Sequence, residues 1–437
     1  MIWDTVVVGG GIAGLACARA LTQSGQRITL IEAQHRLGGR ILTDVSQGVP
    51  VELGAEFVHG KPAVLLDLLR EAGLDIYERT GQFLHATNGV IEGSEGQAAD
   101  ADKDSQDDGD IPFQALDNLS ATANRDLPFS EAVKTMGLDA DEVFWLTRYV
   151  EGFNAADAHL ISAAALKKQQ HAEEAIEGDT SSKPVRGYGA LVDFLAAECR
   201  KLGVEIQLGV PVRTILWREG EVVAVCDEQE FHAKRCVVTL PLGVLLSGNV
   251  QFQPEPEEIF RALRHMEMGS AIRISLLFKT RFWESVAPDL SFLIDRSADL
   301  TAWWTLNPAP PPLITGWAGG PRALQFHSAE QLLNSAIASL AKFFRRSEAE
   351  LRAQLVGWHT HDWQSDPWSQ GAYSYVRSGG LQYLPQLAEP LQDTLFFAGE
   401  HTDQEGHWGT VHAALTSGLR AASQILEAVG TPRPARA

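Results

Sequence analysis

The chain has 437 residues, too many for one ordinary hydrophobic core, so two or three domains are expected. Hydrophobic residues make up 45% and charged residues 21%, as in ordinary globular proteins of aqueous compartments. A formal net charge of −20 excludes the basic surface that non-specific nucleic-acid binding requires, so no nucleic-acid partner is expected. The acidic balance suits a cationic substrate, although acidic surfaces more commonly serve solubility.

The cysteines and the first residues indicate the compartment. The four cysteines lie far apart and form no C-x-x-C pair, which predicts reduced thiols in a cytoplasmic protein rather than disulfides or a zinc site. They are Cys17, Cys199, Cys226 and Cys236. The first segment, MIWDTVVVGGGIAGLACA, has no basic region and is interrupted by Asp4, so it predicts a strand and a helix, not a signal peptide. No stretch approaches about 18 consecutive apolar residues, so no membrane span is expected.

The predicted elements alternate between strands and helices. The first are a strand at 4–8, a helix at 12–21 that ends at Gly25, and a strand at 27–31. Further patterns predict helices at 186–202, 257–265, 329–344 and 409–429, and strands at 205–208, 222–226, 236–240, 272–278 and 394–398. Between 92 and 110 the chain has eight acids, one lysine and no aromatic residue, which predicts a mobile surface loop, with a lid as the alternative.

A glycine-rich turn follows the first strand and opens the first helix. In a G-x-G-x-x-G turn the glycines permit the tight bend, the approach of a pyrophosphate and close packing of the helix on the strand, and the phosphates meet the helix N-terminus. The residues assigned to this turn are Gly9, Gly11, Ile12, Ala13 and Gly14. Glu32 ends the second strand, where an acid accepts hydrogen bonds from a ribose diol. The alternative is a glycine-rich turn and an unrelated exposed glutamate.

A second motif, R-x-G-G-R, follows the acid. It consists of Arg36, Gly38, Gly39 and Arg40, and VELGAEFVHG follows at 51–60. An arginine beside two glycines can reach phosphate oxygens while the backbone stays close to a cofactor.

These motifs carry a resemblance. The run ITLIEAQHRLGGR, residues 28–40, resembles the signature of flavoproteins with two dinucleotide-binding domains. The run TLFFAGEHTDQEGHWGTVHAALTSGLRAASQIL, residues 394–426, resembles the C-terminal FAD motif of the flavin amine oxidases, which include monoamine oxidases, polyamine oxidases and flavin histone demethylases. Matches at 238–245 and 363–374 lie between them, so the resemblance spans most of the chain.

The resemblance implies non-covalent FAD and assigns residues to it. Arg40 would contact the pyrophosphate, Glu400 the ribityl chain, and Val212 the adenine through its backbone. The other implied contacts are Ala33 and Arg36 near the dinucleotide, Gly54, Ala55 and Glu56 near the flavin ring, Gly399 beside Glu400, and Gly409, Thr410 and Val411 at a helix that points toward the flavin. A helix N-terminus there would stabilise negative charge on reduced flavin.

The expected fold is α/β, with a Rossmann-like, two-dinucleotide-binding FAD domain and an inserted substrate domain. The FAD domain is expected at 1–75, 186–265 and 386–437. The substrate domain is expected at 76–185 and 266–385.

The resemblance also implies an aromatic cage over the flavin. Tyr373, in G-A-Y-S, matches one wall, and Thr410 takes the place of the second tyrosine of monoamine oxidases. Trp408 is a further candidate for the pocket wall, with core packing as the alternative for both aromatic residues.

Two positions depart from the family pattern. Ala372 replaces the cysteine to which monoamine oxidases attach FAD, so no covalent linkage is expected there. Arg273 replaces the lysine that holds a water near the flavin; arginine keeps the charge but does not act as a base. Either Arg273 takes over this function, or oxygen reactivity is reduced and another acceptor is used, or the residue forms an ordinary ion pair. Its strand is expected to make none of the dinucleotide contacts.

Two further residues are candidates for substrate contact. Glu56 would bind an ammonium or orient a substrate nitrogen, and His59 would contact substrate, with a structural role as its alternative. No metal-ligand cluster is recognised, because His359 and His361 alternate without a third ligand and therefore predict a strand through Trp363.

The predicted function is FAD-dependent oxidation of a primary or secondary amine, including polyamines, with hydride transfer from the carbon beside nitrogen to flavin N5. Oxygen or another acceptor would reoxidise the flavin. The alternatives are an oxidoreductase of the same fold that acts on an amino acid, a porphyrinogen or a polyene, and a flavin-binding partner protein whose catalytic site has decayed.

Overall fold

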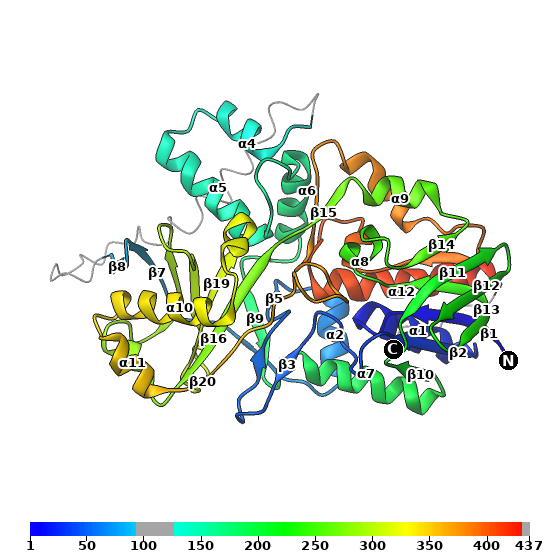
Figure 1. Cartoon of the computed structure of the whole chain (residues 1–437), viewed down its shortest axis with the longest axis horizontal. Helices are drawn as coiled ribbons and strands as arrows, with labels where there is room; N and C mark the ends of the chain where they lie inside the picture. The colour runs from blue at the N-terminus through cyan, green and yellow to red at the C-terminus, as the bar shows by residue number, and fades with distance from the viewer. Residues whose placement is uncertain (93–125, 431–437) are drawn as a thin grey trace.

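Two β-sheets, one in each half of an elongated molecule, organise residues 1–92 and 126–430, which this computed structural model describes (Figure 1). The acidic segment expected to be a mobile loop, 92–110, lies outside the described residues apart from Glu92. None of the described helices is long and apolar enough to span a bilayer.

The first sheet follows the strand order β10–β2–β1–β13–β12–β11–β14, and β22 also pairs with β13. Its strands are β1 (Ile2–Val8), β2 (Ile28–Glu32), β10 (Glu205–Leu208), β11 (Val212–Arg218), β12 (Glu221–Cys226), β13 (Glu230–Val238), β14 (Gln251–Gln253) and β22 (Leu395–Phe397). The strands β10, β2, β1, β13 and β22 are parallel. The runs of valine and isoleucine in β1 and β2 are buried on both faces, as parallel strands between helical layers require.

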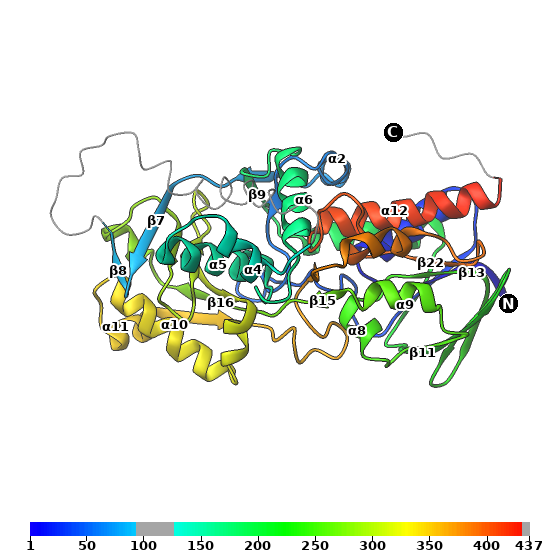
Figure 2. The same ribbon diagram turned by 90° about the horizontal axis from the view of Figure 1, so that it is seen from above.

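Helices cover both faces of this sheet. On one face lie α1 (Ile12–Gln23), α2 (Ala63–Glu71), α7 (Gly189–Leu202) and α12 (Val411–Ala428). On the other lie α8 (Leu242–Leu246), α9 (Glu257–Leu263) and the 3-10 helix η6 (Leu381–Ala388). Figure 2 shows α12, in red, running beside the blue N-terminal segment, although the two are the ends of the chain. A Cβ at Gly418 would overlap the carbonyl oxygen of Ala13, so glycine permits this close approach of α12 to α1.

The second sheet has the order β20–β16–β19–β18–β17–β7–β8. Its strands are β7 (Gln82–Thr87), β8 (Val90–Ile91), β16 (Ala271–Phe278), β17 (Leu290–Asp295), β18 (Ala302–Thr305), β19 (Leu313–Gly319) and β20 (Leu355–His359). Helices α10 (Ala329–Phe343) and α11 (Glu348–Gln354) pack on one face, where Ile274, Leu276 and Phe278 enter the core. Side chains alternate along a strand, so Arg273 projects from the opposite face.

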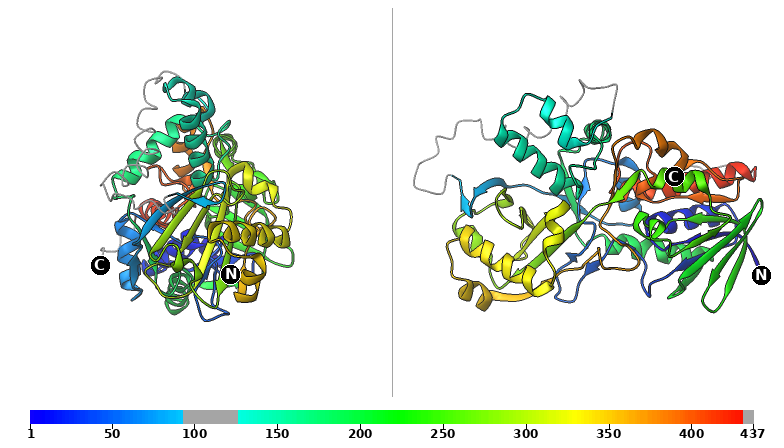
Figure 3. Two further views of the ribbon diagram at one scale, coloured as in Figure 1. Left: turned by 90° about the vertical axis from the view of Figure 1, so that its left-hand side faces the viewer. Right: turned by 45° about the horizontal axis from the view of Figure 1, so that its top comes forward.

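Three helices lie at the top of the molecule in Figure 1, with α5 and α4 over the second sheet, and several short ladders run through the middle (Figure 3). The helices are α4 (Phe129–Ala132), α5 (Ala140–Asn154) and α6 (Ala163–Glu174). The ladders are β3 (Thr43–Asp44) with β4 (Val51–Glu52), β5 (Val58–His59) and β6 (Ile76–Glu78) with β9 (Ser181–Pro184), and β15 (Met266–Met268) with β21 (Ser374–Val376). The remaining 3-10 turns are η3 (Val133–Thr135), η4 (Phe282–Ser285), η5 (Gly320–Gln325) and η7 (Glu400–Thr402).

The elements expected from the sequence are present, with one exception. The strand expected through Trp363 ends at His359, because His361 Nε2 instead bonds Asp366 Oδ2 at 2.9 Å and the Trp363 indole donates to the Leu53 carbonyl at 2.8 Å. The strands of the first sheet all fall within the expected FAD segments, and those of the second all fall within the expected substrate segments. The domain boundaries themselves stay a prediction.

We expect Gly418→Ala to lower the free energy of unfolding by about 1–3 kcal/mol, because the added methyl overpacks the contact between α12 and α1. Gly152→Ala is the matched control: Gly152 is also in a helix, but the atom nearest to a Cβ there, Thr301 Oγ1, lies 4.0 Å away. The control should be neutral or more stable by up to about 1 kcal/mol, as helix propensity predicts. Urea unfolding measures both; equal effects would contradict the close packing.

Candidate active site

One cavity of about 870 Å³ runs between the two sheets and takes its lining from both halves of the molecule. All of the residues expected at the cofactor or catalytic site line it except Gly14 and Arg36. Gly14 instead packs against Gly9 within the turn, where a Cβ would overlap the Gly9 carbonyl. Arg36 Nη1 donates to the carbonyls of Leu37 and Ile41, at 3.3 Å each, and so closes the R-x-G-G-R loop from behind.

The glycine turn has the properties of an anion site. Gly9 has a φ of +110°, which glycine adopts without strain. Helix α1 starts after Gly11 with no side-chain cap and no acid in its first turn, so its first N–H groups are left for another acceptor. A Cβ at Gly11, which lines the cavity, would meet no described atom within 4 Å. An uncapped helix N-terminus beside open space fits the pyrophosphate of a dinucleotide.

Glu32 lies at the end of β2 and lines the same region. Its carboxylate accepts hydrogen bonds from the backbone N–H of Gly10 at 2.7 Å and of Gln34 at 2.8 Å. Burial raises the pKa of Glu32 above its ordinary value, although these backbone donors oppose the shift. A carboxylate has about four acceptor positions, so two remain for a ribose diol.

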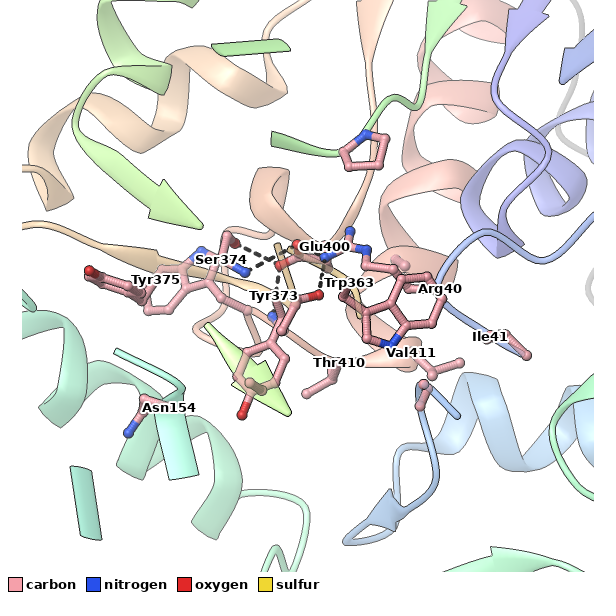
Figure 4. Close-up of a pocket in the computed structure, with 18 of the residues that line it drawn as sticks. Arg40, Ile41, Asn154, Trp363, Tyr373, Ser374, Tyr375, Glu400, Thr410 and Val411 are labelled. Carbon is pink, nitrogen blue, oxygen red and sulfur yellow. Dashed lines mark hydrogen bonds and ion pairs between the residues drawn. The ribbon is translucent and has the colours of Figure 1, made fainter. Parts of the chain in front are cut away.

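Glu400, which is buried, and Arg40, which is half-buried, form an ion pair on the cavity wall (Figure 4). Arg40 Nη1 donates to Glu400 Oε1 at 2.8 Å and to the Ala372 carbonyl at 3.0 Å. Glu400 also accepts from Ser374 Oγ at 2.6 Å, from Ser374 N at 3.3 Å and from Gly409 N at 2.8 Å. Burial opposes ionisation, but Arg40 and the other donors outweigh it and lower the pKa of Glu400. These four donors compete with the ribityl contact, which stays a prediction.

A second helix N-terminus faces the cavity. Thr410 caps α12 by accepting from Ala413 N at 3.1 Å, and the first turn contains no acid. Gly409 has a φ of +80°, and a Cβ there would collide with the Tyr373 ring. The two helix N-termini, together with Glu32, therefore fit a dinucleotide that extends along the cavity, as FAD would.

Tyr373 and Trp408 are aromatic walls of the cavity whose polar atoms are satisfied by the backbone. The Tyr373 hydroxyl donates to the Phe153 carbonyl at 2.6 Å, and burial raises the pKa of Tyr373. The Trp408 indole donates to the Asp403 carbonyl at 3.1 Å. Figure 4 shows Tyr373 beside Thr410, the two positions that the sequence assigns to the cage.

Glu56 lies in a buried ion network. Arg273 Nη2 pairs with one carboxylate oxygen, and Lys183 Nζ pairs with the other. The Trp304 indole also donates to Glu56 Oε1, at 3.1 Å. Burial alone would raise the pKa of Glu56, but the two cations lower it to about 2. Glu56 is therefore ionised, and its oxygens have little capacity left for a substrate ammonium.

Arg273 contacts the segment that the sequence assigns to the cofactor. Its Nη1 donates to the Gly54 carbonyl at 3.0 Å, and its guanidinium lies 5.6 Å from the centre of a Trp304 ring. The side chain is buried, with 4% of its surface exposed, because the glutamate opposite neutralises it. The residue is thus both a buried ion pair and part of the cavity wall.

Three histidines line the cavity near the start of α12. Burial lowers the pKa of His59 to about 4 and that of His412 to about 3; Arg79 adds to the first shift, and the neighbouring imidazoles of His407 and His59 add to the second. Burial also lowers the pKa of His407, whose ring lies 4.7 Å from that of His412. All three rings are therefore neutral near pH 7 and do not repel a cation.

The fold and the cavity together define a dinucleotide-binding protein whose cavity is lined from both halves of the molecule. Residues 12–426 match the model of the family described as flavin containing amine oxidoreductase, and the chain belongs to this family. The family confirms the resemblance, the oxidoreductase class and the flavin cofactor predicted from the sequence.

Curated relatives extend over nearly the whole chain. Polyamine oxidase 2 of Arabidopsis thaliana is 29% identical over 98% of this chain and 89% of its own length. Lysine-specific histone demethylase 2 of Homo sapiens is 29% identical over 97% of this chain and 53% of its own length.

Solved structures show the same fold. Putrescine oxidase bound to putrescine superimposes with a TM-score of 0.81 at 23% identity, over 98% of this chain and 99% of that one. Cyclohexylamine oxidase from Brevibacterium oxydans has a TM-score of 0.81 at 19% identity, over 98% of this chain and 100% of that one. These likenesses confirm the predicted fold class.

Sequence reasoning missed Lys183, the partner of Glu56, and several residues of the cavity wall. Lys183 stands in TSSKPVRGY with no motif around it, and Trp304 lies in a strand that periodicity did not reveal. Tyr149, Phe153 and Glu173 lie on α5 and α6, which were not predicted. The capping-box pattern at 139–142, which opens α5, is the signal that could have located the first of these helices.

We expect Glu32→Ala to weaken FAD binding by about 1.5–3 kcal/mol, because charged acceptors for the ribose diol are lost. Glu205→Ala is the control, since Glu205 is an exposed acid on the neighbouring strand β10, away from the cavity wall. Titration of apoprotein with FAD measures both affinities, and an unchanged affinity in Glu32→Ala would remove Glu32 from the cofactor site.

We expect Glu56→Gln to lower the free energy of unfolding by about 3–5 kcal/mol at pH 7, because two buried cations lose their partner. The folded pKa of about 2 lies below the ordinary 4.5, so the stabilisation is complete above pH 4.5 and is lost as the pH falls toward 2. The difference in free energy of unfolding between the wild type and Glu56→Gln should therefore be about 1 kcal/mol smaller at pH 4 than at pH 7.

The control is Glu177→Gln, which breaks the exposed pair with Lys61 and should change stability by less than about 1 kcal/mol. Urea unfolding at the two pH values measures all three proteins. A pH-independent difference for Glu56→Gln would contradict the network.

Proposed function

We propose that the protein oxidises a primary or secondary amine, with polyamines among the candidates, by means of non-covalently bound FAD. One observation supports this most directly. A single cavity joins the uncapped N-terminus of α1 to the N-terminus of α12 and to the aromatic and neutral histidine side chains around it. This arrangement suits a cofactor and a small cationic molecule side by side.

The residues of the first sheet would hold FAD. Glu32 would accept bonds from the ribose, and the turn at 9–14 would bind the pyrophosphate with Arg40. The start of α12 would face the flavin ring. Ala372 occupies the position of the family's attachment cysteine, and no nucleophile takes its place, which supports non-covalent attachment. When bound, FAD accepts the electrons removed from the substrate carbon beside nitrogen.

The chamber would bind the amine through aromatic faces. An ammonium is attracted to the face of Tyr373 or Tyr149 by a cation–π interaction, and the neutral rings of His59, His407 and His412 do not oppose its entry. Trp304 and Trp408 are buried in its wall and Tyr149 and Tyr373 are half-buried, so the amine would lie against aromatic surface.

Arg273 would serve as a fixed positive charge and not as a base. Its guanidinium is held by Glu56 and by the Gly54 carbonyl, so its orientation is set by the protein. Positive charge beside the Gly54 segment favours negative charge on a cofactor in contact with that segment. Both oxygen and a different electron acceptor are compatible with this role.

We further propose a cytoplasmic location and a small-molecule amine as the partner. The four cysteines are buried and unpaired, as in a reducing compartment.

The test is anaerobic reduction of the purified holoprotein with a panel of amines. We expect a yellow protein that releases intact FAD on acid precipitation and whose flavin absorbance bleaches with an amine. Amino acids, a porphyrinogen and a polyene serve as comparison substrates. Bleaching by one of these and by no amine would favour the alternative activity; flavin that precipitates with the polypeptide would contradict non-covalent attachment.

A further inference from the structure

The hydroxyl groups of the predicted cage are engaged within the protein. The Tyr373 hydroxyl donates to the Phe153 carbonyl at 2.6 Å, and the Thr410 hydroxyl donates to the His407 carbonyl at 2.7 Å. Asn154 lines the same cavity, but within the part of the chain that the structure describes its side-chain amide takes part in no hydrogen bond. Asn154 therefore offers the cavity an acceptor and a donor that the described protein leaves unused.

The fold brings Asn154 next to the cage. Asn154 is the last residue of α5, and Ala155 ends the helix with a left-handed φ of +52°. The Ala155 carbonyl accepts from Ser270 N at 2.9 Å, which fixes the backbone on one side of Asn154. The Tyr373 hydroxyl fixes the other side, because the Phe153 carbonyl to which it donates belongs to the peptide group that joins Phe153 to Asn154. The backbone therefore sets the position of Asn154 relative to Tyr373.

Asn154 is also well buried, with 7% of its surface exposed. Figure 4 shows it below Tyr375 and to the left of the Tyr373 ring. Buried polar groups nearly always have a hydrogen-bond partner, because the loss of water without a replacement is costly. A buried amide that lines a cavity and has no partner in the described protein indicates a place where a ligand supplies one.

The chemistry of amine oxidation gives an uncharged acceptor a use at this position. The nitrogen must be deprotonated before a hydride leaves the neighbouring carbon, because its lone pair forms the new C=N bond. A neutral primary or secondary amine then still has an N–H bond, whereas a neutral tertiary amine has none. An amide oxygen accepts a hydrogen bond from such an N–H. Because the amide carries no charge, it does not favour the ammonium form over the reactive neutral amine, as a carboxylate would.

We infer that Asn154 is a specificity-determining residue of the amine site, whose amide oxygen accepts a hydrogen bond from the N–H of the neutral amine that lies at Tyr373. The bond holds the nitrogen, and with it the neighbouring C–H bond, in one orientation relative to the cofactor. A tertiary amine forms no such bond and leaves the Asn154 amide buried without a partner. The inference rests on the proposed amine oxidation and adds to it the group that selects the amine by its N–H.

The experiment compares N-methylbenzylamine with N,N-dimethylbenzylamine, which has the same benzyl carbon and no N–H in its neutral form. N-methyloctylamine and N,N-dimethyloctylamine provide an aliphatic pair. Anaerobic stopped-flow reduction of the holoprotein gives a rate constant and a dissociation constant for each amine. For each pair that reduces the wild-type flavin, we expect the rate constant divided by the dissociation constant to be about 10- to 100-fold larger for the secondary amine.

Two variants of Asn154 separate the hydrogen bond from the bulk of the extra methyl group. Asn154→Leu has nearly the same shape and no hydrogen-bonding group, so its value for the secondary amine should fall close to that for the tertiary amine, which should change little. Asn154→Asp keeps an acceptor oxygen in the same place and should keep the preference. A preference caused only by the bulk of the methyl group would persist in Asn154→Leu and would contradict the inference.

A control variant and a stability measurement test whether the effect is specific. Asn334→Leu makes the same substitution at an exposed asparagine of α10, away from the cavity wall, and should leave the preference unchanged. Asn154→Leu should leave the urea midpoint unchanged or raise it, because it removes a buried amide without a partner. A lower midpoint together with an unchanged preference would assign Asn154 to folding alone. The FAD content of each variant shows that the cofactor is bound.

The outcomes separate the role of Asn154 from the activity. A wild type that reacts equally well with secondary and tertiary amines, or an Asn154→Leu protein with the wild-type preference, would overturn the inference while amine oxidation stands. If Asn154→Leu does not retain FAD, Asn154→Ala takes its place, since it also lacks the acceptor. Failure of all four amines to bleach the flavin of the FAD-bound wild type would overturn the proposed function for such amines and the inference with it.

Discussion

The position of the two halves of the molecule relative to each other depends on the contacts of the Glu56 carboxylate. It belongs to the chain that leaves the first sheet, and its donors come from β9, β16 and β18, the last two in the second sheet. The charges are buried, so water does not screen them, and an unpaired cation there would be strongly destabilising. The network therefore fixes the position of the two sheets relative to each other around the cavity that they share.

The nucleotide end of the cavity follows from a different constraint, the close approach of two helices that are far apart in the sequence. Gly418 lets α12 lie against α1, and both helices direct their N-termini into the cavity. Their dipoles add where a negatively charged cofactor would lie. Arg40 adds a positive charge to this part of the cavity. Glu400 accepts a hydrogen bond from one guanidinium nitrogen and offsets part of that charge.

The chamber has the opposite electrostatic character. Arg273 is paired with Glu56, and the histidines are kept neutral by burial. A cation that enters therefore meets aromatic faces and neutral imidazoles. Burial raises the pKa of Glu173, on the same wall, to about 7.

The sequence by itself determined which residues form the dinucleotide end of the cavity, because the groups that bind phosphate and ribose are close together in the chain. Gly9 and Gly11 act through the backbone of one turn, and Glu32 ends the adjoining strand. It also placed Tyr373 and Thr410 on the wall through a family motif. Only the tertiary structure decided the partners of Arg273. Lys183 and Glu56 are separated by more than a hundred residues, and no periodicity links them. Ion pairs and pocket walls depend on which strands meet in space, so Arg273 became a buried partner of Glu56 and Glu173 became the acid that faces the chamber.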